Sequence, residues 1–267
     1  MFLCDYHLHS DCSVDGDDSI SKLAEVLCQK GFDEFAVTDH LDVNRNYTMG
    51  NFRDFYNPER YFSELLKARE LYPIQIKAGI EIGQPYHQID ICRAVMDQFT
   101  YDFVILSLHT TQKYGDISKV DYREIPAHAV MLKYFSELYD SLDFKDFDVL
   151  GHLDFPKRYM LRSGVDIDMN DYMDEQRQIL KKALSMGKGI ELNLSGIRKG
   201  LGYYHPIMPV LKLYRELGGE IITVGEDGHR ISEAGCNIED GYEILRQAGF
   251  SYFCTFTNRK PEFHKLS

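Results

Sequence analysis

Short apolar runs, rich in β-branched and aromatic residues, alternate with helix-patterned segments along this chain. The strand-like runs lie near residues 4–9, 35–40, 74–82, 103–109, 148–153, 189–195 and 220–225. The helical patterns lie near residues 20–28, 58–71, 88–98, 127–142, 169–186, 207–217 and 237–248. This order predicts an α/β fold in which crossover helices connect parallel strands. Seven strands without a clear topological break favour a TIM-like barrel over an open sheet.

Length and composition agree with one domain that spans residues 1–267. A chain of 267 residues with 44% hydrophobic content buries a substantial core, and α/β barrels of this size commonly form a single domain.

Three features predict a soluble, cytoplasmic protein. No run approaches the roughly 18 consecutive apolar residues of a membrane span. The N-terminus enters a strand directly, without the charged and apolar regions of a signal peptide. The six cysteines contain no C-x-x-C pair and several lie in apolar patterns, so we expect reduced core thiols rather than disulfides.

The net charge of −12 argues against nucleic acid as a partner. Affinity for a phosphate backbone comes largely from lysine and arginine side chains that displace counterions. We therefore expect a small-molecule partner, and neither nucleic acid nor membrane.

Six of the seven strand-like runs end on histidine, aspartate or glutamate. These endings are Cys4–His9, Phe35–His40, Gly79–Glu81, Val104–His109, Val149–His152 and Ile221–His229. A polar side chain at the end of an apolar strand is costly unless it has a partner. The carboxyl ends of barrel strands meet at one face, so a shared partner is the simplest explanation. The pattern predicts a polynuclear metal site.

The first of these endings places two imidazoles on one side of a strand. Side chains alternate with a period of two, so His7 and His9 point the same way and can bind one ion. An H-x-H pair is a weak motif by itself, because two histidines that face core or solvent would look the same. Asp15, six residues after His9, and His40, after the next strand, strengthen the metal interpretation.

The ordered motifs resemble the polymerase and histidinol phosphatase (PHP) family, and within it the histidinol-phosphate phosphatases. The motifs are Asp5-Tyr6-His7-Leu8-His9-Ser10, Val37-Thr38-Asp39-His40, Gly79-Ile80-Glu81 and Gly225-Glu226-Asp227-Gly228-His229. The resemblance implies a distorted (β/α)7 barrel with three divalent metal ions.

The resemblance also implies which residues hold each ion. One ion would be bound by His7, His9, Glu81 and Asp227, a second by Glu81, His109 and His152, and a third by Asp15, His40 and His229. Glu81 would then bridge the first two ions. Imidazole and carboxylate ligands without thiolates suit Zn, Fe or Mn, and the sequence does not choose among them.

Two arginines follow strand ends and are candidates for binding phosphate. Arg158 lies six residues after His152, and Arg198 lies just past the strand-like run near 189–195. A guanidinium fork matches phosphate oxygens. Either arginine alone is equally well explained as a surface cation that pairs with one of the 42 acidic residues. The resemblance implies that arginines after these strands hold the substrate phosphate.

The expected reaction is hydrolysis of L-histidinol phosphate to L-histidinol and phosphate, a step of histidine biosynthesis. A metal-activated hydroxide would attack the phosphorus, with Glu81 among the catalytic residues as the bridging ligand. Asp15, His229 or a metal-bound water could protonate the leaving oxygen.

Two other functions stay open at this point. The same site could serve a phosphodiesterase or nucleotide phosphatase of the PHP family, or its ions could only stabilise a non-catalytic metal-binding module. Relatives more often have Ser and Ala where this chain has Glu226 and Gly228, which puts the organic half of the substrate in doubt.

Smaller expectations complete the interpretation. Asp39 and Asp154 flank proposed ligands and are expected to orient an imidazole. The loops over 42–57 and 110–126 are expected to contact substrate. The final stretch, 251–267, is expected to form one strand followed by a basic tail.

Overall fold

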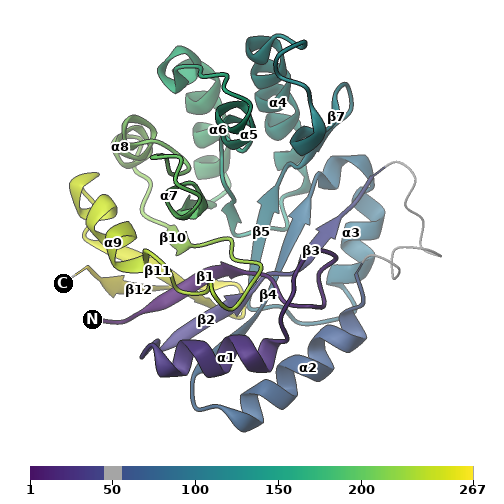
Figure 1. Ribbon diagram of the computed structural model, residues 1–267, viewed down its shortest axis with the longest axis vertical. Helices are drawn as coiled ribbons and strands as arrows, with labels where there is room; N and C mark the ends of the chain where they lie inside the picture. Colours follow the sequence, from purple (N-terminus) through teal and green to yellow (C-terminus); the bar gives the residue numbers. More distant parts are fainter. Residues whose placement is uncertain (45–55, 267) are drawn as a thin grey trace.

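Seven parallel strands form a nearly closed barrel in the computed structural model, which describes residues 1–44 and 56–266 (Figure 1). In sheet order they are β1 (Cys4–Leu8), β2 (Glu34–Val37), β4 (Gln75–Gly83), β5 (Phe103–Ser107), β8 (Val149–Leu150), β9 (Gly189–Asn193) and β10 (Ile222–Gly225). An isolated parallel bridge between Leu8 and Gly228 brings the segment after β10 against the end of β1. The predicted seven-stranded barrel is therefore confirmed.

Helices surround the barrel and connect its strands (Figure 1). They are α1 (Ile20–Gln29), α2 (Pro58–Leu71), α3 (Ile89–Met96), α4 (Ala127–Ser141), α5 (Pro156–Arg162), α6 (Met173–Ser185), α7 (Ser195–Arg198), α8 (Met208–Glu216) and α9 (Ile238–Gln247). Helix α1 illustrates why they form: Ser19 caps its first turn, and Ile20, Leu23 and Leu27 bury one face. Short 3₁₀ turns occur at Pro85–His87, Ile117–Lys119, Leu142–Phe144 and Met169–Tyr172.

Strand β4 shows how an apolar strand delivers a charged group to the barrel end. Ile80 and Ile82 are fully buried in the hydrophobic core, and Glu81 between them is equally buried. Because successive side chains of a strand alternate sides, Glu81 faces away from the two isoleucines. It faces the histidines at the neighbouring strand ends.

A short strand that the sequence pattern did not separate lies next to Glu81. Strand β3 (His40–Asp42) pairs in parallel with the end of β4, and His40 is the register partner of Glu81. The predicted run over 35–40 is thus divided between β2 and β3. This second pairing extends the sheet beyond the end of β2 and brings His40 into the ligand cluster.

The C-terminal stretch forms a hairpin instead of one strand and a basic tail. Strands β11 (Tyr252–Thr257) and β12 (Lys260–Lys265) pair in antiparallel register, so the predicted tail was wrong. The hairpin contacts residues that lie just before two barrel strands. Asn258 N–H donates to Asp102 Oδ1 at 3.1 Å, and Arg259 Nε lies 2.6 Å from Asp148 Oδ2. The hairpin therefore packs against the amino ends of strands, opposite the end that carries the proposed ligands.

The expected substrate loops are described in part. Residues 45–55 of the first loop lie outside the described residues. The second loop contains a small hairpin, β6 (Thr110–Thr111) and β7 (Gly115–Asp116). All six cysteines lie in the described ranges and are free thiols; four of them are buried, as expected of core thiols, whereas Cys28 and Cys236 are partly exposed. Across those ranges, no helix has the length and apolar character needed to cross a membrane.

Candidate metal centre

All nine predicted ligands gather at the carboxyl ends of the barrel strands. Each histidine in the group has a ring nitrogen within 4.0 Å of a carboxylate oxygen of another member, and each acidic member has an oxygen within 4.0 Å of a histidine ring nitrogen. The group consists of His7, His9, Asp15, His40, Glu81, His109, His152, Asp227 and His229. Segments separated by more than two hundred residues in the chain thus meet in one cluster. Which members bind an ion stays a prediction.

Glu81 lies at the centre of the cluster, and its two oxygens face different histidines. Oε1 lies 3.0 Å from His152 Nε2 and 3.3 Å from His109 Nε2. Oε2 lies 2.8 Å from His40 Nδ1 and 3.3 Å from His7 Nε2. Burial acts to raise the pKa of Glu81, but His7 and His109 outweigh it and hold the pKa well below its usual value. A carboxylate placed between two groups of imidazoles is suited to bridge two cations.

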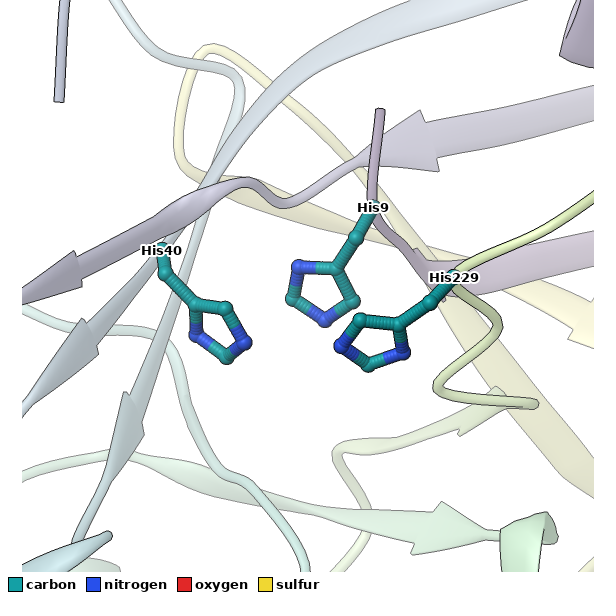
Figure 2. A group of neighbouring side chains, drawn as sticks. All are labelled: His9, His40 and His229. Atoms are coloured by element: carbon teal, nitrogen blue, oxygen red, sulfur yellow. The ribbon is translucent and has the colours of Figure 1, made fainter. Parts of the chain in front are cut away.

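A second part of the cluster consists of three neighbouring imidazoles. Figure 2 shows His9, His40 and His229 side by side, and their ligand atoms lie within 4.8 Å of one another. The ring of His9 stacks on His40 at 4.1 Å and on His229 at 4.3 Å between centroids. Asp15 Oδ2 lies 3.2 Å from His229 Nε2 and 3.7 Å from His40 Nε2. The proposed third-ion ligands are therefore close together, with His9 beside them.

Buried nitrogens in the cluster lack hydrogen-bond partners among the described residues. They include Nε2 of His7, both ring nitrogens of His9 and Nδ1 of His152. In addition, Nε2 of His109 and Nε2 of His152 face each other at 3.3 Å. Buried polar atoms without partners are unfavourable, and several in one place call for a shared one. Imidazoles and carboxylates without thiolates fit Zn, Fe or Mn.

Two carboxylates that the sequence interpretation missed orient the histidines. Glu191 Oε1 lies 2.6 Å from His7 Nδ1, and Glu191 Oε2 accepts the His152 backbone N–H at 2.9 Å. Asp42 Oδ1 lies 2.8 Å from His109 Nδ1. Such contacts fix the ring orientation and the tautomer of a metal-binding histidine. The sequence did hold a signal for Glu191, because it interrupts the apolar strand β9.

Replacing Glu191 with glutamine should weaken both metal binding and activity. One Glu191 oxygen accepts from the His7 ring and the other from the His152 backbone N–H. Glutamine would replace one of these oxygens with an NH₂ group, which cannot accept a hydrogen bond from the N–H that it faces. We expect a loss of about ten- to a hundredfold in metal affinity or turnover. Metal titration and steady-state kinetics would measure it, with Glu25→Gln on the exposed face of α1 as the control. Unchanged metal affinity and turnover in Glu191→Gln would contradict the orienting role.

The two aspartates that were expected to orient ligand imidazoles have other partners. Asp39 accepts the backbone N–H and the hydroxyl of Ser10, both at 2.6 Å. Asp154 Oδ1 lies 2.6 Å from Nδ1 of His205, a buried residue outside the cluster. No side-chain hydrogen bond joins Asp39 to His40 or Asp154 to His152, because other residues occupy the two carboxylates. That part of the prediction was wrong.

A cavity of about 720 Å³ opens over the cluster. Six of the nine predicted ligands line it: Asp15, His40, His109, His152, Asp227 and His229. Its other walls include Arg158, Tyr159, Arg162 and Lys199. Volumes of a few hundred cubic ångströms are typical of small-molecule sites. The cluster is therefore accessible to a ligand of metabolite size.

Arg158 is a buried cation in the wall of this cavity. Its Nη2 lies 2.8 Å from Asp227 Oδ2, and its guanidinium carbon lies 4.8 Å from the centroid of the Phe155 ring. Its buried Nε has no hydrogen-bond partner among the described residues. Burial opposes ionisation of Asp227, but Arg158 and His7 hold the pKa of that carboxyl well below its usual value. Arg158 thus holds Asp227 in its charged form and keeps one donor available.

Arg198, the other predicted phosphate ligand, is not among the residues that line the cavity. Its Nε lies 2.8 Å from Glu226 Oε2, and its Nη1 lies 2.5 Å from Glu233 Oε1. Its role in phosphate binding stays a prediction. The residue after it, Lys199, does line the cavity.

Comparisons with known proteins agree with this geometry. The PHP domain family matches residues 5–195 of the chain. A histidinol-phosphatase of Lactococcus lactis subsp. lactis is 29% identical over 98% of this chain and 97% of its own length. A probable histidinol-phosphatase of Clostridium acetobutylicum is 27% identical over 97% and 95%.

Solved structures share the fold. The crystal structure of histidinol phosphate phosphatase from Lactococcus lactis subsp. lactis Il1403, complexed with Zn, L-histidinol and phosphate, matches with a TM-score of 0.83 and 25% identity. The match covers 97% of this chain and 98% of that one. A putative histidinol phosphatase from Listeria monocytogenes has the same fold, with a TM-score of 0.75, 19% identity and coverage of 89% and 99%. The family inferred from the ordered motifs is confirmed: the chain belongs to the PHP domain family.

Proposed function

We propose that this protein is a metal-dependent phosphomonoesterase that hydrolyses L-histidinol phosphate to L-histidinol and phosphate. The observation that carries the proposal is the nine-residue cluster of imidazoles and carboxylates beneath a cavity of metabolite size. Relatives that match over nearly the whole chain are named histidinol-phosphatases, and one related structure holds Zn, L-histidinol and phosphate. A role in histidine biosynthesis follows from this substrate.

The cluster would hold three divalent ions, and we propose zinc, iron or manganese. His7, His9, Glu81 and Asp227 would bind the first, Glu81, His109 and His152 the second, and Asp15, His40 and His229 the third. When bound, such ions supply a water activated near neutral pH and neutralise charge on the phosphoryl oxygens. Glu191 and Asp42 would hold the rings of His7 and His109 in place for them.

Arg158 would bind the phosphate group. Its guanidinium is fixed by Asp227 and lies over the Phe155 ring, so little side-chain freedom is lost when a phosphate oxygen accepts its N–H groups. For the departing alcohol, we propose as the proton donor whichever of Asp15 and His229 does not bind the third ion, since a metal ligand is deprotonated. Both line the cavity and contact each other at 3.2 Å.

The proposed partner is a small phosphate monoester in the cytoplasm, not nucleic acid or a membrane. The net charge of −12 supports the exclusion of nucleic acid, because polyanions are repelled unless basic side chains neutralise them.

The direct test compares substrates on metal-loaded protein. We expect phosphate release from L-histidinol phosphate with a kcat/KM at least about tenfold above that for AMP or bis(p-nitrophenyl) phosphate. A colorimetric phosphate assay with separately loaded Zn, Mn and Fe protein would measure the monoesters, and nitrophenol release would measure the diester. Preferred cleavage of the diester would favour the phosphodiesterase alternative. No turnover of any ester with bound metal would leave a non-catalytic metal-binding module.

A further inference from the structure

Two adjacent cations follow strand β9 and have different surroundings. Arg198 is the last residue of helix α7, and Lys199 directly follows it. The inference drawn from them rests on the proposed function, because it concerns how the phosphate group is held.

The guanidinium of Arg198 is already occupied. Besides its ion pairs with Glu226 and Glu233, its Nη2 donates to the backbone oxygens of Glu226 at 3.2 Å and Asp227 at 3.1 Å. These four contacts use most of the five N–H donors of an arginine. Glu226 is fully buried and burial raises its pKa to about 8, so releasing Arg198 to a phosphate would leave a buried carboxyl oxygen without its hydrogen-bond donor.

The contacts of Arg198 instead support the backbone of a proposed metal ligand. Asp227 has a φ of +53°, in the left-handed region that non-glycine residues adopt at a cost. The Asp227 carbonyl accepts from Arg198, while its Oδ1 lies 3.7 Å from Nε2 of His9. Arg198 therefore holds the segment in the conformation that directs the Asp227 carboxylate towards the histidines.

Lys199 has the opposite surroundings. It lines the cavity together with Arg158 and Asp227. Among the described residues, its amine has no hydrogen bond or ion pair within 4.0 Å. Lys199 is an exposed residue, but the groups around its amine reduce its contact with water, and this desolvation, together with the neighbouring Arg158, lowers the pKa of Lys199 to about 8. An anion bound beside Lys199 would raise this pKa again, because it favours the charged form of the amine.

We propose that Lys199, rather than Arg198, joins Arg158 in binding the substrate phosphate, and that Arg198 is a positioning residue that acts through Asp227. The phosphate would then lie between a fixed guanidinium from α5 and an exposed ammonium just after α7. Lysine binds phosphate as a point charge, without the paired hydrogen bonds of an arginine fork.

The test uses full-length, metal-loaded protein, with inorganic phosphate as the probe in calorimetric titrations and L-histidinol phosphate in steady-state assays. Lys199→Met should raise the phosphate Kd and the substrate KM about tenfold with little change in kcat, as expected for loss of one charge-assisted contact. Lys199→Arg should recover most of the affinity. Lys212→Met, on the exposed face of α8, is the matched control.

Arg198→Met should have the opposite effect on the two kinetic constants: a lowered kcat with little change in KM. At saturating metal we expect KM within about twofold of wild type and kcat lowered about tenfold, with weaker metal binding because Asp227 is misplaced. Arg198→Lys should recover part of kcat.

Two results would overturn the proposal. One is wild-type phosphate affinity in Lys199→Met, and the other is a raised KM in Arg198→Met with kcat and bound metal intact. Failure of the wild-type protein to hydrolyse any monoester would instead overturn the proposed function, and the phosphate titrations would still decide the role of Lys199.

Discussion

Glu81→Gln is expected to lower kcat/KM for L-histidinol phosphate on the order of a thousandfold, because one carboxylate serves two groups of imidazoles. Its Oε1 faces His109 and His152, and its Oε2 faces His7 and His40. Glutamine keeps the size but presents a neutral oxygen to one group and an NH₂ to the other. The variant should therefore lose bound metal as well as turnover. Steady-state kinetics and elemental analysis of the purified variant would measure both.

A control separates this effect from a general effect of removing a carboxylate. Glu70→Gln changes an exposed residue of α2 and should keep wild-type metal content and turnover. Glu81→Gln with full metal content and activity within about threefold of wild type would show that Glu81 neither bridges nor binds ions, since ligand loss at a metal site has far larger effects.

Removing the metals is the second large effect, and it has a readout besides activity. Chelation should abolish phosphate release and lower Tm by roughly 5–10 °C, because an ion that binds only the folded state stabilises that state by mass action. The buried nitrogens of His7 and His9 would also lose their partner. Calorimetry before and after chelation would measure the shift.

Adding back single metals completes this experiment. Zn, Mn or Fe should restore both Tm and phosphate release, and the metal that restores most activity identifies the preferred ion. A chelated protein, verified metal-free by elemental analysis, that keeps wild-type Tm and turnover would contradict a metal centre in this cluster.

The cluster itself was predictable because its signal is local. Most of the ligands lie at or just after the end of an apolar strand, and barrel topology brings the carboxyl ends of parallel strands together, while the full set of nine came from the resemblance to the PHP family. His7 and His9 could be placed on one side of a strand from the period of two alone. For the same reason Glu191, a charged residue inside β9, could have been recognised from the sequence.

The arginines show where local patterns stop being sufficient. Arg158 and Arg198 both follow strand ends, yet one lines the cavity and the other is held by Glu226 and Glu233. The short helices α5 and α7 that carry them were not predicted, because seven and four residues are too few for a clear helical period. Glu226 was noted as a departure from the relatives, but its contact with Arg198 joins two different segments of the chain.

Strand order, the seven-stranded barrel and the gathering of nine ligands follow from the order of residues, because secondary-structure periods and the geometry of parallel strands are encoded locally. The partners of Asp39, the position of the C-terminal hairpin and the choice between Arg198 and Lys199 do not. They depend on which side chains from distant segments reach the same space, and packing and burial decide this only when the whole chain has folded.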